Sequence, residues 1–322
     1  MSVITRMNKV RKNTSWVEIM PIATLIILVI LTSIGSPRFL LPASLLGLLS
    51  QSATLLVMGL GETFIILMGS IDLSIAPIAA MASVIAAMLL PIFGYWAFVI
   101  AALFGAFAGA LTGVVHTKAR IPSFIATLGA MGLWTGVAFV VSDATPISVG
   151  SSEAQYLTWV TGTTFGLPNV VIIGFVVLVI TYIMEKYTRF GRYVKAIGAG
   201  EKATTVSGVP IDRYKIMAFM LCATLAAFSG ILLSTRMSGG SARMADGFLM
   251  KAIAVVILGG TAISGGIGGV LRTFIGVLIV MVLEVGMNMV GVNPWFQQAI
   301  FGGIIILAVA LTIDRSRITI IK

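Results

Sequence analysis

Long apolar runs alternate with short polar or glycine-rich breaks along almost the whole chain of 322 residues. A helix needs about 20 apolar residues to cross a hydrocarbon core about 30 Å thick. The run at 249–258 is short, and the runs flanking residues 69–77 are either two crossings or one broken element. The pattern predicts an all-α polytopic membrane protein with about ten transmembrane helices, at residues 16–34, 45–68, 74–92, 95–115, 122–141, 168–185, 216–235, 249–258, 270–291 and 295–313.

Basic residues are distributed along the chain in the way that encodes membrane orientation. Four of them lie between positions 6 and 12, which places the N-terminus in the cytoplasm. Ten crossings from there put the basic loop 186–215 and the C-terminus on the same side, and the loop 143–167, which lacks Lys and Arg, outside. Both termini are therefore predicted to be cytoplasmic. Arg236 and Arg243 fall outside, against the rule, and weaken the eighth crossing most.

The expected organisation is one membrane domain between two short tails. Residues 1–15 and 314–322 form the cytoplasmic tails. Residues 16–313 form a single transmembrane domain, with 186–215 as its largest cytoplasmic loop. Ten crossings allow two halves of five helices each. Because each half has an odd number of helices, the two halves would have inverted orientations in the membrane. The broken segments 69–77 and 239–251 would then correspond, although the halves share no convincing sequence similarity.

The composition is that of a protein whose surface faces lipid. Only 10% of the residues are charged and 58% are apolar, too little charge to solvate a soluble chain of this length. The net charge of +10 comes mainly from the chain ends and a few loops, so nucleic acid is not an expected partner. The single cysteine, Cys222, and the single histidine, His116, exclude an internal disulfide and argue against a metal site.

Polar residues at membrane depth are the first candidates for function. Glu62 and Glu284 lie within predicted crossings, where a charge costs roughly 2.5–3.5 kcal/mol on insertion scales and therefore usually faces a bundle interior or a wet cavity. The alternatives are a hydrogen bond between helices or a glutamate protonated in place. With residues on the same helical faces and in the break that follows, the predicted solute path comprises Gln51, Thr54, Met58, Glu62, Asp72, Ser74, Glu284 and Asn288.

The break at 69–74 also has a purely structural interpretation. Gly69 permits a sharp turn, and Asp72 or Ser74 can cap the next helix by accepting its free N–H groups. Pro77 then suits the first turn of that helix. Capping alone explains these residue types, and a place in the solute path would be an additional role.

Glycines spaced by four residues predict close helix packing. Gly105, Gly109 and Gly113 share one face of the fourth crossing, and Gly132 and Gly136 share a face of the fifth. Such faces let two backbones approach closely in a membrane. These glycines carry no information on the substrate.

The glycine cluster at 265–269 resembles a nucleotide-binding loop only superficially. It follows a membrane run rather than a strand, no acidic residue follows at the required distance, and the chain has no Walker lysine motif. We therefore expect no bound cofactor in this chain. The sequence shows no nucleophile with a base nearby, so we do not expect an intramembrane enzyme.

The cytoplasmic segment 198–210 predicts a short helix that projects from the membrane domain. A helix at 201–207 would show a small apolar face, Gly208 would end it, and Pro210 would bar its continuation. Such a helix is suited to docking a motor subunit, and the alternative is a solvated turn between two crossings. The predicted docking residues are Gly198, Glu201, Ala203, Val206, Ser207 and Gly208.

Three segments in order resemble the ribose-type branch of ABC importer permeases, in the branched-chain amino acid/ribose permease superfamily. Residues 69–74 read Gly-Ser-Ile-Asp-Leu-Ser, close to that family's Gly-Gly-Ile-Asp-Leu-Ser signature. Residues 196–209 resemble its loop that contacts the ATPase, and 252–266 resemble its late glycine-rich signature. The sequence departs from the usual residues at five positions, which leave the particular sugar open: Ser70, Gly200, Leu249, Lys251 and Glu284.

The resemblance implies a transport subunit of the bacterial inner membrane that takes up a monosaccharide, such as a ribose-like pentose, by alternating access. It implies a second permease subunit, two cytoplasmic ATP-binding cassettes that use ATP and Mg²⁺, and an extracytoplasmic solute-binding protein. The alternatives are a branched-chain amino acid permease of the same superfamily and an ion-coupled transporter. The latter would use Glu62, Asp72 or Glu284 as its ion site.

Overall fold

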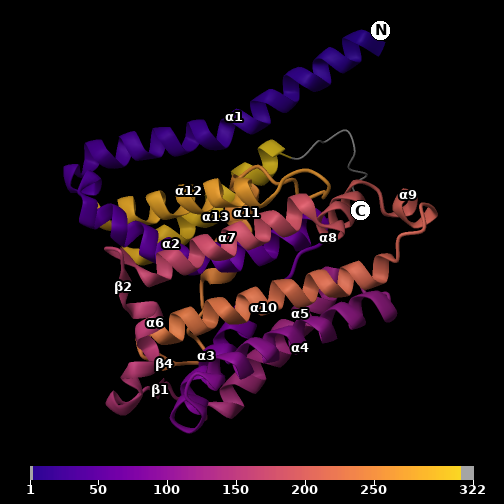
Figure 1. The fold of residues 1–322 in the computed structure, drawn as a ribbon. Helices are drawn as coiled ribbons and strands as arrows, with labels where there is room; N and C mark the ends of the chain where they lie inside the picture. The colour runs from indigo at the N-terminus through magenta and orange to yellow at the C-terminus, as the bar shows by residue number, and fades with distance from the viewer. Residues whose placement is uncertain (1–2, 313–322) are drawn as a thin grey trace.

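The computed structural model describes residues 3–312, and each predicted apolar run coincides with a helix (Figure 1). The predicted tail 314–322 lies outside the described residues, and most of the predicted tail 1–15 is continuous with the first helix. The ten helices are α1 Val3–Gly35, α2 Pro42–Leu67, α3 Ile75–Phe93, α4 Trp96–Lys118, α5 Ser123–Val141, α7 Asn169–Tyr187, α10 Ile211–Met237, α11 Phe248–Leu258, α12 Val270–Met289 and α13 Pro294–Thr312.

Seven of these helices are long and apolar enough to cross a membrane, within the described residues: α2, α3, α4, α5, α7, α10 and α12. The all-α polytopic membrane fold is therefore confirmed. The weak eighth run forms α11, a helix of 11 residues that is too short to count among the seven. α2 and α3 are separate helices joined by residues 68–74.

Short elements lie at the two ends of the bundle. The strands β1 Ile147–Ser148 and β4 Gly239–Gly240 pair antiparallel, as do β2 Thr163–Thr164 and β3 Leu167–Pro168. We call the end that carries β4 the β4 end and the opposite end, which carries α9, the α9 end (Figure 1). The remaining elements are η1 Pro37–Leu40, η2 Ser151–Leu157, α6 Thr158–Thr161, α8 Arg189–Ala199 and α9 Glu201–Val206.

α2 is the central helix of the bundle. It packs against α10 on one side and against α7, α11 and α12 on the other. Every residue from Ser52 to Leu67 is buried, so this helix has no face toward lipid. A helix that is apolar all round belongs in such a position.

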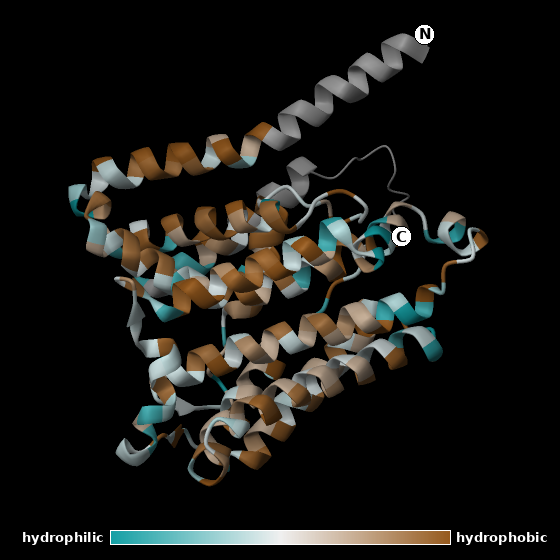
Figure 2. Ribbon diagram, in the orientation of Figure 1, coloured by the Kyte–Doolittle hydropathy of each residue, from teal (hydrophilic) through white to brown (hydrophobic). Residues whose placement is uncertain are grey.

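The outer helices expose apolar side chains, and the ribbons of α1 and α7 are coloured mainly brown for hydrophobic residues (Figure 2). Ile30, Phe107, Phe175 and Val140 are each more than half exposed. Apolar surface on this scale marks contact with a membrane. The chain is therefore a multi-pass membrane protein.

Close approach of α4 to α10 depends on three glycines. A Cβ at Gly105, Gly109 or Gly113 would overlap atoms of α10, including its backbone. Gly132 and Gly136, predicted to pack in the same way, are exposed on α5 and would meet nothing within 4 Å. The prediction that these two glycines pack against another helix of the chain is therefore wrong, because the face of α5 that carries them points away from the bundle.

These two environments make Gly109 and Gly132 a matched pair for mutation. Gly109→Ala places a methyl group against the carbonyl of Phe219, and we expect overpacking to cost about 1–3 kcal/mol of unfolding free energy. Gly132→Ala should leave stability unchanged or slightly raised. Reversible unfolding in mixed micelles measures both values. Equal effects would contradict the assigned packing.

Candidate functional site

The three segments that carry the resemblance meet at the α9 end. The backbone N–H of Gly266 donates to the carbonyl of Leu67 over 2.9 Å, which joins the late glycine loop to the end of α2. Gly198 of α8 lies against both, and a Cβ there would overlap the Leu67 carbonyl and the Gly266 nitrogen. Gly198 was predicted as a docking residue, but its contacts make it a packing residue between three backbones.

A buried glutamate fixes the neighbouring helices at this end. Glu185, near the end of α7, accepts the N–H of Val270 at the start of α12 over 2.7 Å. Its other oxygen pairs with Lys195 of α8 over 2.6 Å. The sequence analysis treated Glu185 only as the end of a crossing, and its position among basic residues gave no specific signal.

The break between α2 and α3 is held by buried hydrogen bonds, which leave Oδ2 of the Asp72 carboxylate without a partner among the described residues. The N–H of Asp72 donates to Glu62 Oε1 over 3.1 Å, and the thiol of Cys222 lies 3.6 Å from Glu62 Oε2. Asp72 Oδ1 accepts both the N–H and the hydroxyl of Ser74, over 2.8 and 2.6 Å. These bonds tie residues 70–74 to α2 and α10 and position the start of α3.

This cluster is closed rather than open to a path. Glu62, Asp72 and Ser74 are fully buried, as is Met58, and none of them lines the polar cavity near β4 or the cleft beside α9. The place of these four residues in a solute path stays a prediction. Asp72 accepts the backbone N–H of Ser74 two residues later, which makes an Asx turn before α3. No side chain caps the first turn of α3, so the helix-capping prediction is replaced by a turn.

A polar cavity of about 120 Å³ lies nearer the β4 end, between α2, α10, α11 and α12. Three predicted path residues, Gln51, Thr54 and Glu284, line it together. Asn288 does not line it, because that side chain is exposed and accepts a hydrogen bond from Gln297 Nε2 over 2.8 Å. The other lining residues are Leu55, Leu233, Arg236, Phe248, Lys251 and Met281.

Two cations and one carboxylate set the electrostatics of this cavity. Lys251 Nζ lies 2.7 Å from Glu284 Oε1, and each of these side chains is about one-fifth exposed, at 23% and 21%. Arg236 Nη1 donates to the hydroxyl of Thr54 over 3.5 Å. The sequence analysis did not include Arg236 or Lys251 in the path. The signal was present, since Arg236 breaks the positive-inside rule and Lys251 departs from the family pattern.

The predicted cytoplasmic helix is α9, and it projects from the α9 end of the bundle (Figure 1). Thr204 faces inward, and its hydroxyl donates to the carbonyls of Ala196 and Gly200 over 2.9 and 2.8 Å. Gly208, at φ +79°, follows in the left-handed conformation that ends the helix. Val206 is 90% exposed, so the apolar tip of α9 lacks a partner within the described chain.

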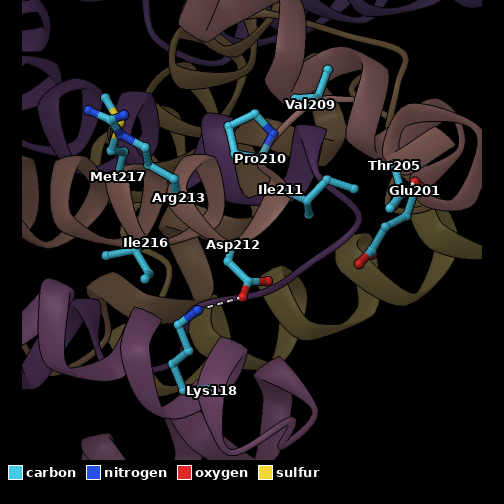
Figure 3. Close-up of a pocket in the computed structure, with 10 residues that line it drawn as sticks. All are labelled: Lys118, Glu201, Thr205, Val209, Pro210, Ile211, Asp212, Arg213, Ile216 and Met217. Carbon is cyan, nitrogen blue, oxygen red and sulfur yellow. Dashed lines mark hydrogen bonds and ion pairs between the residues drawn. The ribbon is translucent and has the colours of Figure 1, made fainter. Parts of the chain in front are cut away.

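A cleft of about 610 Å³ lies between α9, the start of α10 and the end of α4 (Figure 3). Glu201 of α9 receives both hydrogen bonds from Lys215 Nζ, over 2.9 Å each. Lys118 of α4 pairs with Asp212 of α10 over 2.8 Å across the cleft floor, and both side chains are more than half exposed. An exposed pair of this kind contributes at most about 1 kcal/mol. The cleft is therefore a surface that a partner can remodel.

The fold and these sites define a membrane permease, with a small polar cavity between its helices and a short projecting helix. The family model described as "Branched-chain amino acid transport system / permease component" matches residues 44–309, and the chain belongs to this family. A comparison with the solved structures finds no match.

Relatives of known name share most of their length with this chain. The ribose import permease protein of Escherichia coli is 36% identical over 289 residues, which are 88% of this chain and 90% of that one. The ribose import permease protein of Bacillus subtilis is 35% identical over 302 residues, 92% of each chain. The D-allose transport system permease protein of Escherichia coli is 30% identical over 290 residues, 89% and 88% of the two chains.

The Asx turn gives a direct test of what Asp72 does. Asp72→Ala removes the acceptor of two Ser74 donors and should lower the unfolding free energy by about 1–3 kcal/mol. Asp72→Asn keeps an oxygen acceptor and should recover most of that loss. Unfolding of the purified variants in micelles measures both. Two variants as stable as the parent would contradict a role for Asp72 in this turn.

Proposed function

We propose that this chain is the permease subunit of an ATP-driven ABC importer that takes up a monosaccharide, a ribose-like pentose or a related sugar. The observation that carries the proposal is the similarity to relatives that are named as a ribose import permease and a D-allose transport system permease. The L-arabinose ABC transporter permease protein of Azospirillum brasilense is also 31% identical over 285 residues. The same family description covers branched-chain amino acid permeases, but a cavity lined by Gln51, Thr54 and Glu284 suits hydroxyl groups better than an aliphatic side chain.

The proposed cycle is alternating access. An extracytoplasmic binding protein delivers the solute at the β4 end, where weak polar contacts from several helices accept it and let it leave. Two cytoplasmic ATP-binding cassettes hydrolyse ATP with Mg²⁺, and this chain binds neither. A second permease subunit, the same or a homologous chain, completes the path. The complex lies in the bacterial inner membrane.

The connection between α9 and the cavity supports this cycle. α9 is tied to α8 through Thr204 and to α10 through Glu201. α8 in turn packs through Gly198 on the end of α2 and on the loop after α11. α2, α10 and α11 all line the cavity. A displacement of α9 by an ATPase therefore reaches three cavity helices through close backbone contacts.

The proposed topology retains ten crossings with both termini cytoplasmic. α1, α11 and α13 would join the seven long apolar helices, and the connection of α11 to the loop 259–269 would complete the eighth crossing. Two inverted halves of five helices remain part of the proposal. The orientation follows from the basic residues on α8 and at the ends of α4 and α7.

Val206 tests the docking role of α9. Val206→Asp puts a charge on the apolar tip and should lower ATP-dependent sugar uptake at least tenfold, while the purified permease remains stable. Phe165→Asp is the matched control for binding of the ATPase. Phe165 lies between β2 and β3 and is 99% exposed, and this variant should bind the ATPase as the parent does, whereas Val206→Asp should not. Uptake by vesicles that contain the permease, its neighbouring ATPase and its binding protein is the measurement.

Three results would contradict the proposal. Unchanged uptake in Val206→Asp and after deletion of residues 201–207, in a permease that still folds, would exclude docking through α9. Uptake that follows a proton gradient and ignores ATP would indicate an ion-coupled transporter. Uptake of branched-chain amino acids in place of sugars would move the chain to the other branch of its family.

The topology can be tested with single cysteines, because Cys222 is the one native cysteine and it is fully buried. On a Cys222→Ser background, Ser151→Cys should react with an impermeant maleimide in sealed spheroplasts. Lys202→Cys should react only after the membrane is opened. Both positions are exposed, so differences in reactivity report sidedness. Labelling of Lys202→Cys in sealed spheroplasts would overturn the assigned orientation.

A further inference from the structure

The polar cavity at the β4 end carries one positive charge more than it can neutralise. Its charged lining residues are Arg236, Lys251 and Glu284. Lys251 and Glu284 form an ion pair with a separation of 2.7 Å between Nζ and Oε1. Among the described residues no carboxylate lies within 4.0 Å of the Arg236 guanidinium. The cavity therefore has a net charge of +1 that arises from Arg236.

The guanidinium of Arg236 has unused N–H donors that can bind a ligand in the cavity. Arg236 lies in the last turn of α10 and is partly buried, and its side chain reaches Thr54 on α2. That hydrogen bond, at 3.5 Å to the hydroxyl, is at the outer limit of length. A guanidinium has five N–H donors in a planar fork that matches a carboxylate in two parallel bonds. Most of these donors are not used by the described residues.

A partly buried cation is stabilised by an opposite charge or by water. Arg236 lies in the last turn of α10 and is partly removed from water, so an anion beside its guanidinium would be favourable. The paired lysine shows the usual solution, since Lys251 has its own glutamate on the neighbouring helix. Arg236 lacks such a partner among the described residues and faces a cavity large enough for several waters.

We propose that the transported solute is an acidic monosaccharide, a sugar acid whose carboxylate pairs with Arg236. This inference rests on the proposed function and names the class of sugar. The ring of Phe248 offers an apolar face, and Gln51 and Thr54 offer donors and acceptors for the hydroxyls. A single unpaired positive charge matches a monoanionic carboxylate, whereas a phosphate carries close to two negative charges at pH 7.

The experiment compares acidic and neutral sugars in the complete transporter. Vesicles that contain the permease, its neighbouring ATPase and its binding protein are given labelled D-glucuronate, D-gluconate, D-glucose, D-ribose or D-glucose 6-phosphate with ATP inside. Wild-type uptake of at least one sugar acid should exceed uptake of both neutral sugars tenfold or more. Arg236→Gln should lower uptake of that acid at least tenfold, and Arg236→Lys should restore part of it.

Arg243→Gln is the matched control. Arg243 lies seven residues further along on the same end of the molecule, but it is exposed, stacks over the ring of Phe139 at 5.6 Å and does not line the cavity. Uptake in this variant should equal that of the parent. A loss equal to that of Arg236→Gln would show that general surface charge, rather than the cavity, attracts the acid. Stability of each variant in micelles separates loss of binding from loss of folding.

The outcomes distinguish this inference from the proposed function. ATP-driven uptake of ribose or glucose, with no preference for acids and no effect of Arg236→Gln, would overturn the acidic solute and leave the sugar importer intact. Preference for glucose 6-phosphate would overturn the carboxylate assignment. ATP-driven uptake of none of the five probes would count against the importer of monosaccharides and therefore against this inference as well.

Discussion

Direct contact between backbones at the α9 end is the constraint on which the rest of the structure depends. The Leu67 carbonyl, the Gly266 N–H and the backbone of Gly198 lie in direct contact, and a Cβ at position 198 would overlap the other two groups. This contact joins the central helix α2, the helix α8 and the loop after α11. Packed backbones are stiff, so a force applied at α9 is transmitted rather than absorbed. Glu185 extends the same junction to α7 and α12.

Polar groups inside the bundle fall into two kinds with different consequences. The set formed by Glu62, Asp72 and Ser74 holds the break before α3 in one shape, although Asp72 Oδ2 is buried without a hydrogen-bond partner among the described residues. The cavity near the β4 end is the opposite case, because Arg236 keeps unused donors there. The first kind fixes the shape of the backbone before α3, and the second leaves hydrogen-bond donors free to bind a ligand. Hydropathy treats both alike, since each is a charge within an apolar run.

The helices could be predicted from sequence because apolar runs and their breaks are local signals. The limits of α9 followed from Gly208 and Pro210, and the structure places the helix within one residue of that prediction. Which polar residues meet could not be predicted in the same way, since a helical face does not specify its neighbour. Glu62 was therefore assigned to an open path although it lies in a closed cluster, and Gly132 was assigned to a contact that α5 does not make. Arg236 did leave a trace, as an exception to the charge rule.

The small sheet beside the cavity has a thermodynamic consequence. Ser238 ends α10 in the left-handed conformation at φ +52°, and β4 then pairs with β1, whose residue Ile147 is distant in sequence. The segment that follows Arg236 is thus already ordered before any solute arrives. Binding then costs little conformational entropy, and the contacts made by the solute are not offset by ordering a loop. Such preorganisation allows a short-lived, low-affinity complex to remain selective.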